Sequence, residues 1–175
     1  MHYKLLFLLI EGDDDDRFFR RIVKPKFEEK YDNVILWKYS QQKSTKVDNF
    51  LKSIKAMGAD YIYLADIDPE PCVTSKKKEI QNKFKNIDID RIIVVIKEIE
   101  SWYLAGLDSS ECRRLLIRCL ENTNDVTKEQ FNTLIPKRFD RIDFMLEVLK
   151  NFSIETAKEK NISFKYFLEK YNCEF

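Results

Sequence analysis

Four short apolar runs in the first part of the chain constrain its fold more than any other feature. They occupy residues 3–10, 33–39, 60–65 and 91–96 and are rich in leucine, β-branched and aromatic side chains. Each run is too short for a helix, and each is followed by a polar stretch, which is typical of buried strands alternating with helices. The sequence therefore predicts the order βαβαβαβ.

The stretches after the first two runs carry apolar residues at helical spacing. One stripe comprises Phe18, Phe19, Ile22, Val23 and Phe27, and the other comprises Val47, Phe50, Leu51, Ile54 and Met57. Pro25 falls within the first stripe and is expected to bend or shorten that helix. Strands that alternate with helices favour an α/β fold of the Rossmann type: a four-stranded, mainly parallel sheet flanked by helices on both faces.

Three glycines each follow a predicted element. Gly12 makes the turn after the first strand, Gly58 takes the position after a helix end, and Gly106 ends the segment EIESWYLAG. Glycine suits such positions because it adopts turn conformations without a side-chain penalty.

Beyond Gly106 the pattern is wholly helical. One stripe comprises Cys112, Leu115, Leu116, Cys119 and Leu120, and another comprises Phe139, Ile142, Met145, Leu146, Leu149 and Phe152. We therefore expect an α/β core over residues 1–106 and a C-terminal helical extension over residues 107–175, packed on the same domain.

Composition excludes several classes of protein. The 175 residues carry 31 basic and 30 acidic side chains, so no global positive field indicates nucleic acid. The apolar run at residues 5–10 is too short to span a bilayer and is followed by acids rather than by a cleavage site, so we expect no signal peptide and a cytoplasmic location. The four cysteines show no metal-finger spacing and His2 stands alone, so we expect neither a zinc site nor disulfides.

Acidic residues follow three of the four predicted strands. Glu11 and the run Asp13–Asp16 follow the first, Asp66 and Asp68 follow the third, and Glu98 and Glu100 follow the fourth. Functional sites of parallel α/β sheets lie at the carboxyl ends of the strands. Carboxylates gathered at one edge repel one another unless a cation shares the site, and Mg²⁺ prefers such oxygen ligands. The sequence predicts a divalent-cation site.

Each acidic cluster also has a structural interpretation. Aspartates at a helix start stabilise the helix dipole, an Asp-Pro pair forms a turn, and a glutamate at the fourth cluster can lie on the surface. Only the occurrence of all three clusters at strand ends favours a site.

With these residues in place, the chain resembles the Toprim domain, the catalytic module of topoisomerases, bacterial primases and OLD-family nucleases. LLIEGDDDDRFF matches the glutamate turn and LADID the DxD motif, whereas IIVVIKEIESWYLAG and ETAKEKNISFKYFLEK resemble compact Toprim-related proteins grouped with OLD-type nucleases. The frequent family aspartate after the tryptophan segment is replaced here by Gly106, with Asp108 nearby.

The resemblance implies a Mg²⁺- or Mn²⁺-dependent nuclease that uses one or two ions to hydrolyse DNA or RNA. It assigns acid or base catalysis to Glu11 and Glu100. It assigns metal binding to Glu11, Asp15, Asp66, Asp68, Glu98 and Glu100. A protein partner in a defence-type system is a further candidate.

Local basic residues are candidates for contacts with nucleic-acid phosphates. They are Lys76, Lys77, Lys78, Lys97, Arg113 and Arg114, with Lys83, Lys85 and Arg118 beside them. Lysine-rich helix surfaces also serve solubility alone, so these residues indicate a nucleic-acid partner only together with the acidic site.

Three other functions remain open. A receiver-type signalling module would make Asp66 a phospho-acceptor, and a haloacid-dehalogenase-type phosphatase would make it a nucleophile, although the DxD motif stands here on the third strand. A non-catalytic Toprim-like module that binds Mg²⁺ and a protein partner is the third. Nothing in the sequence distinguishes DNA from RNA or reveals the oligomeric state.

Overall fold

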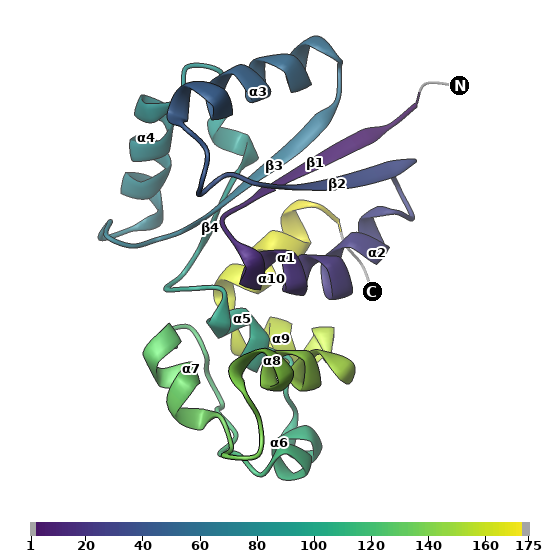
Figure 1. The fold of residues 1–175 in the computed structure, drawn as a ribbon, viewed down its shortest axis with the longest axis vertical. Coiled ribbons are helices and arrows are strands. Elements are labelled where there is room, and N and C mark those ends of the chain that lie inside the picture. Colours follow the sequence, from purple (N-terminus) through teal and green to yellow (C-terminus); the bar gives the residue numbers. More distant parts are fainter. Residues whose placement is uncertain (1–2, 173–175) are drawn as a thin grey trace. The chain divides into compact units, whose positions relative to one another are not determined.

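A computed structural model describes residues 3–172 of the chain (Figure 1). The chain divides into two compact units, Met1–Val94 and Val95–Phe175. The sequence predicts a boundary after residue 106, between an α/β core and a helical extension. That boundary stays a prediction. His2 and Cys173 lie outside the described residues.

The four predicted strands are confirmed. They are β1 (Leu5–Ile10), β2 (Asn33–Lys38), β3 (Asp60–Asp66) and β4 (Ile92–Val95), and they form one sheet in the order β2-β1-β3-β4. Strand β1 pairs in parallel with both β2 and β3. The predicted α/β class with a parallel sheet flanked by helices is therefore correct.

The strand order reverses direction beside β1. The chain leaves β1 for β2 on one side and then crosses over to β3 on the other, so the switch point lies between β1 and β3. A crevice opens at the carboxyl ends of the strands at such a point because the two connections diverge there. Glu11 follows β1 directly and Asp66 closes β3, so both residues lie at this switch point.

Helices of the first unit cover the sheet on both faces (Figure 1). On one side lie α3 (Ser44–Ala56) and α4 (Val73–Lys83), and on the other lie α1 (Asp13–Phe18) and α2 (Lys24–Phe27). A single turn of 3-10 helix, η2 (Ile89–Arg91), leads into β4.

Pro25 interrupts the first predicted helix. A π-helical segment, η1 (Phe19–Val23), joins α1 to α2, and Pro25 stands in the first turn of α2. Proline has no backbone N–H and cannot continue the hydrogen-bond pattern of an α-helix. The wider π-helical turn changes the direction of the chain before Pro25. The apolar stripe nevertheless buries Phe18, Phe19, Val23 and Phe27 as predicted.

The core between the sheet and the pair α3 and α4 follows strand alternation. Phe7 and Leu9 of β1 and Tyr61, Tyr63 and Ala65 of β3 lie in one cluster. That cluster also includes Val47, Leu51 and Ile54 of α3 and Ile80 of α4. Met57 is an exception to the predicted stripe: it is 56% exposed because α3 ends before it, and Gly58 follows at φ +65° as predicted for a residue beyond a helix end.

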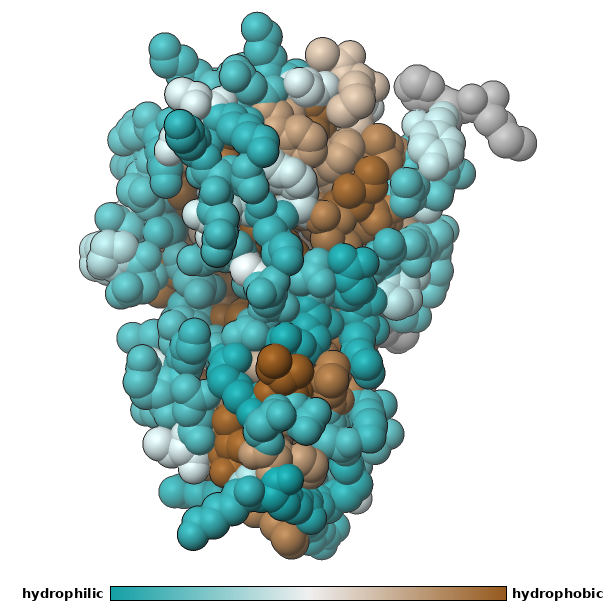
Figure 2. All heavy atoms as spheres, viewed as in Figure 1, coloured by the Kyte–Doolittle hydropathy of each residue, from teal (hydrophilic) through white to brown (hydrophobic). Residues whose placement is uncertain are grey.

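Strand β2 forms an edge of the sheet and is less completely covered than β1. Its residues Ile35, Leu36 and Trp37 are partly exposed, whereas five of the six residues of β1 are buried. Figure 2 shows hydrophobic colour on the face of the first unit where β2 lies.

The second unit is built from helices, and after β4 no further strand occurs within residues 3–172. The helices are α5 (Glu100–Ala105), α6 (Ser109–Leu115), α7 (Lys128–Leu134), α8 (Arg141–Lys150), α9 (Ile154–Lys160) and α10 (Ile162–Lys170). Trp102, Tyr103, Phe131, Phe144 and Phe164 are fully buried in it. Side-chain N-caps begin five of the helices, at Asp108, Thr127, Asp140, Ser153 and Asn161.

Two predicted stripes of this part need correction. Helix α6 ends at Leu115, and Leu116 adopts a left-handed conformation and is 74% exposed, so Cys119 and Leu120 lie in the following loop. In α8 the buried residues are Phe144, Met145, Val148 and Leu149, whereas Ile142 is exposed. The spacing located both helices but misjudged where the first one stops.

The expectation of no disulfide is wrong, because Cys112 and Cys119 are bonded to each other. The seven-residue separation carried no recognisable spacing, and the loop after α6 brings the second cysteine back to the helix. Within residues 3–172, no helix has the length and apolar character needed to cross a bilayer.

Gly106 has a packing role. A Cβ built on this residue would lie 2.2 Å from the ring of Phe152, far inside van der Waals contact. A side chain at this position has no room beside that ring, so the packing here favours glycine.

Candidate functional site

Three of the four aspartates after β1 form ion pairs with basic side chains. Asp13 pairs with Lys38 of β2 at 2.6 Å, Asp14 pairs with Arg17 at 2.7 Å, and Asp16 pairs with Arg20 at 2.9 Å. The hydrogen bond and the charge of Lys38 lower the pKa of Asp13. Three of the four aspartates therefore serve the helix start and its surroundings, as the structural interpretation predicted for such residues.

Asp15 differs from its neighbours because it is buried, at 8% exposure. Its Oδ2 accepts a hydrogen bond from the backbone N–H of Gly12 at 3.2 Å. Asp15 therefore fixes the turn that carries Glu11, and a carboxylate at this depth in the first turn of α1 is favoured by the helix dipole.

Glu11 is exposed, and its carboxylate has no hydrogen-bond or ion-pair partner among residues 3–172. Its charge is nevertheless felt by two tyrosines. Burial raises the pKa of Tyr39 well above its usual value, and Tyr63, Glu11 and Asp15 raise it further. Burial also raises the pKa of Tyr63, with Glu11 contributing in the same direction. The charge of Glu11 therefore acts on both tyrosines.

Tyr39 follows β2 directly and contacts both β1 and β3. Its backbone N–H donates to the carbonyl of Ile10 at 3.0 Å, and its hydroxyl reaches across the end of β1 to the carbonyl of Leu64 in β3 at 2.6 Å. Its ring stacks on that of Tyr63 with centroids 4.5 Å apart. Tyr39 thereby ties the ends of β2, β1 and β3 together. Sequence reasoning missed this role, although Tyr39 ends the second apolar run.

Asp66 ends β3, and Asp68 lies in the turn that follows. Tyr61, Tyr63 and Ala65 face the cluster beneath α3 and α4, and Ile67 packs against the same cluster. Asp66 therefore belongs to the opposite alternation of the strand, whereas Asp68 lies beyond the end of β3, and a shared side for the two carboxylates stays a prediction. Asp68 is exposed, and its carboxylate is unpaired within the described part of the chain.

This geometry limits how many carboxylates converge. Glu11 follows β1 and Asp66 ends β3, so both lie at the carboxyl ends of two paired strands. Among residues 3–172 no three histidine, cysteine, aspartate or glutamate side chains lie close enough to hold a metal ion. Mg²⁺ keeps several waters when bound and takes one or two carboxylates from the protein.

Glu98 and Glu100 belong to the second unit, and both have partners there. Glu98 accepts a hydrogen bond from the backbone N–H of Lys128, at the start of α7, at 2.5 Å. Glu100 is 3% exposed and pairs with Arg141 of α8 at 2.5 Å. Such partners give both carboxylates a structural use, and sequence reasoning missed Arg141 because it lies 41 positions from Glu100.

The lysines after the DxD turn are not equally accessible. Lys76 has a side chain that is only 12% exposed, and its ammonium donates to the carbonyl of Asp68 at 2.9 Å and pairs with Glu79 at 3.1 Å. Lys76 therefore holds the turn that carries Asp68. Lys77 is half-buried and Lys78 is exposed.

Three predicted phosphate contacts lie in the second unit. Lys97 is exposed and adopts a left-handed conformation at φ 64°. Arg113 is exposed, whereas Arg114 pairs with Glu111 at 2.8 Å and with Glu147 at 3.0 Å. Arg114 therefore already has two carboxylate partners.

Solved structures share this fold. The C-terminal region of the OLD protein of Xanthomonas campestris pv. campestris matches over 97% of this chain and 94% of its own length, with 14% sequence identity and a TM-score of 0.52. The chain has the fold of an OLD C-terminal region. The corresponding region of the Burkholderia pseudomallei OLD protein matches over 97% of this chain and 98% of its own, with 14% identity and a TM-score of 0.49.

At this identity the similarity to the OLD region concerns the fold, and no protein-family model and no curated protein sequence matches the chain. The fold similarity agrees with the OLD-related part of the resemblance seen in the sequence. The Toprim assignment itself stays a prediction.

Proposed function

We propose that this OLD-like chain is a Mg²⁺- or Mn²⁺-dependent phosphodiesterase that hydrolyses DNA or RNA at the carboxyl edge of the first unit's sheet. The observation that carries the proposal is Glu11: an unpaired carboxylate over the end of β1, at the switch point whose other strand ends in Asp66. An exposed carboxylate at this position is accessible to a cation or a substrate. A cytoplasmic location is part of the proposal.

Each acidic residue has a distinct role in this proposal. Asp66 and Asp68 hold the metal ion, and Glu11 orients the attacking water as general base. Asp15 positions Glu11 through the Gly12 N–H. When bound, the ion neutralises phosphate charge and lowers the pKa of a coordinated water.

Glu98 and Glu100 receive no chemical role in the proposal. Arg141 balances the charge of Glu100, and the Lys128 N–H occupies Glu98. A general base needs a carboxylate free to accept a proton, and Glu11 meets that condition better than Glu100.

Phosphate contacts at this edge are assigned to the exposed cation Lys78, which belongs to the same unit. Binding through such contacts weakens as salt is added, because each neutralised phosphate releases a counterion. Lys76 is assigned to holding the Asp68 turn instead.

A non-catalytic module that binds Mg²⁺ and a protein partner is the second candidate. It is favoured by the lack of a three-ligand group among residues 3–172, since a binding module needs no complete catalytic set. A module of this kind binds Mg²⁺ without cleaving nucleic acid.

The test is cleavage of labelled single- and double-stranded DNA and RNA with Mg²⁺ or Mn²⁺, alongside calorimetric titration of the metal. We expect Glu11→Gln to lose at least about 100-fold in rate, the size of a general-base contribution. Asp66→Asn and Asp68→Asn should weaken metal binding and lose rate with it. Asp13→Asn is the matched control, because Asp13 lies on the same turn but is paired with Lys38.

Metal-dependent cleavage that persists in Asp66→Asn would exclude this site. Metal binding without cleavage of any of the four substrates would favour the non-catalytic module instead. Absence of both would leave neither function standing.

A further inference from the structure

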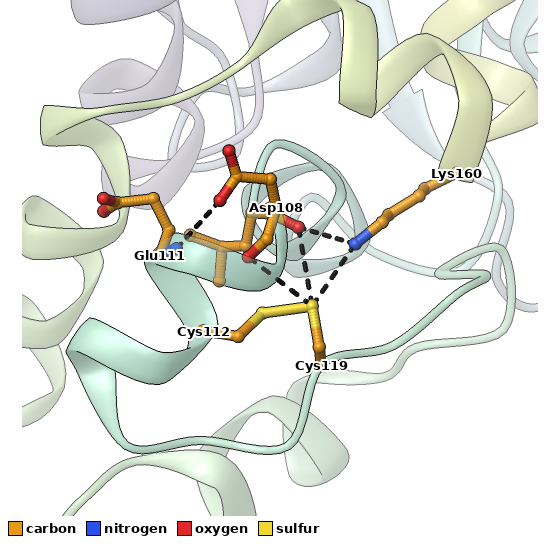
Figure 3. The surroundings of a disulfide bond; sticks show 6 residues. Asp108, Glu111, Cys112, Cys119 and Lys160 are labelled. Carbon is orange, nitrogen blue, oxygen red and sulfur yellow. Dashed lines mark hydrogen bonds between the residues drawn. A yellow bond between two sulfur atoms is a disulfide. The ribbon is translucent and has the colours of Figure 1, made fainter.

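The disulfide of the second unit joins two sulfur atoms in very different surroundings. Cys112 is buried within α6, at 3% exposure, whereas Cys119 is partly exposed in the loop that follows. Their Cα atoms are 5.4 Å apart. Figure 3 shows the bond below the start of α6, with the side chain of Lys160 reaching toward it.

Lys160, the last residue of α9, contacts only one of the two sulfurs. Its ammonium lies 3.6 Å from Sγ of Cys119 and donates to the carbonyl of Leu107 at 2.5 Å. Sγ of Cys119 lies 3.6 Å from the carbonyl of Asp108 (Figure 3). The cation is therefore held beside Cys119 by a backbone contact that does not involve either cysteine side chain.

Among residues 3–172 no carboxylate forms an ion pair with the Lys160 ammonium. Burial lowers the pKa of Lys160, and the more distant charges of Asp108, Glu121 and Glu159 act in the opposite direction. The Asp108 side chain is occupied as the N-cap of α6, where it accepts from the Glu111 N–H at 2.8 Å. A negative charge on Cys119 would supply the partner that Lys160 lacks.

Reduction of the disulfide would place that negative charge at Cys119. A thiolate beside an ammonium group is stabilised, whereas a thiol buried in apolar surroundings resists ionisation. Cys119 is therefore the nucleophile of the reduced pair, and Cys112 is the less acidic partner held within reach of it.

We propose that Cys112 and Cys119 form a redox-active dithiol in which Lys160 activates Cys119 for exchange with small-molecule disulfides of the glutathione class. In the first step the Cys119 thiolate attacks one sulfur of the small disulfide, forms a mixed disulfide and expels one small thiolate. In the second, Cys112 loses its proton, attacks Sγ of Cys119 and expels the other thiolate. The protein loses two electrons and two protons, and the small disulfide becomes two thiols.

The same asymmetry slows the reverse reaction. An incoming thiol reaches the partly exposed Cys119 more readily, but attack there must expel the buried Cys112, whose thiolate is the poorer leaving group. Attack at Cys112 would release the stabilised Cys119 thiolate, but that sulfur is covered. The oxidised pair therefore forms readily and is reduced slowly.

The test follows alkylation of the reduced protein by iodoacetamide as a function of pH, with each cysteine resolved by peptide mass spectrometry. In Cys112→Ser, which leaves Cys119 free, we expect Cys119 to react at neutral pH faster than unfolded cysteine peptide. Lys160→Met should slow this reaction about threefold to tenfold, because loss of the neighbouring charge leaves less thiolate, an effect that higher intrinsic nucleophilicity partly offsets. Lys160→Arg keeps the charge and should retain most of the rate.

Circular dichroism confirms that each variant is folded, and the exposed Cys72 provides an internal reference whose rate should not change. A second readout treats the reduced chain with oxidised glutathione. The unaltered chain should form the Cys112–Cys119 disulfide, whereas Cys112→Ser should accumulate a glutathione adduct on Cys119. The proposal is overturned if Cys119 reacts no faster than the peptide, if Lys160→Met leaves its rate unchanged, or if the adduct forms on Cys112.

Discussion

Replacing Arg141 by methionine tests whether Glu100 has a structural use. Arg141 pairs with Glu100 at 2.5 Å, lies over the ring of Phe131 at 5.7 Å and donates to Asn132 at 2.9 Å. Glu100 is 3% exposed, so the substitution leaves a buried carboxylate without its cation. Loss of one partner of a buried pair costs about 3–5 kcal/mol, and because 26% of the Arg141 side chain is exposed we expect about 3 kcal/mol.

The free energy of unfolding is measured by urea denaturation at neutral pH, and a loss of this size lowers the melting temperature of a chain of this length by about 6–12 °C. Arg114→Met is the matched control. Arg114 pairs with two carboxylates, but 38% of its side chain is exposed. We therefore expect this substitution to lower the free energy of unfolding by about 1 kcal/mol or less.

A double-mutant cycle completes the test. Glu100→Gln combined with Arg141→Met removes both charges, so the double variant should recover about 2 kcal/mol relative to the sum of the single losses. Additive losses, or an Arg141→Met cost no larger than that of Arg114→Met, would refute the buried pair. Loss of nuclease activity in Glu100→Gln at unchanged stability would instead return Glu100 to a catalytic role.

Three further perturbations follow from the geometry. Gly106→Ala should destabilise the chain by about 1–3 kcal/mol, because its Cβ meets the Phe152 ring at 2.2 Å, and Phe152→Leu should partly relieve that loss in urea denaturation. Gly58→Ala should cost about 1 kcal/mol through its φ of +65°, whereas Gly12→Ala, with extended backbone and open space, should leave the urea midpoint unchanged. Burial raises the pKa of Tyr61 to about 12, whereas tyrosine in the unfolded chain ionises near pH 10. The contribution of Tyr61 to stability is therefore complete below about pH 10 and is lost as the pH rises to about 12. Tyrosinate absorbance that appears already near about pH 10 in the folded chain would contradict this.

The acidic run shows how a sequence pattern acquires meaning only in the fold. Asp13 to Asp16 look equivalent as letters, yet Lys38 of the neighbouring strand neutralises the first and the Gly12 turn uses Asp15. Glu11, separated from them by one glycine, keeps an unpaired carboxylate. The local partners Arg17 and Arg20 were predictable from helical spacing, whereas Lys38 was not because it depends on strand pairing.

The sequence alone determined the four strands and their arrangement in a parallel sheet. Short β-branched runs that alternate with segments of helical periodicity have few other ways to bury their apolar faces. It also located Glu11 and Asp66 at strand ends, since the end of a buried run is visible in the residues themselves. Helix ends were less certain: nothing local announced that α6 stops at Leu115.

Only the tertiary structure decided which charges are free. The pairing of Glu100 with Arg141, the contact of Lys160 with Cys119 and the closeness of Phe152 to Gly106 each join residues at least 41 positions apart. Such contacts depend on how whole helices pack, and packing is set by the combined shape of many side chains rather than by any one motif. The acids at the strand ends were therefore readable in advance, and their division into neutralised and available groups was not.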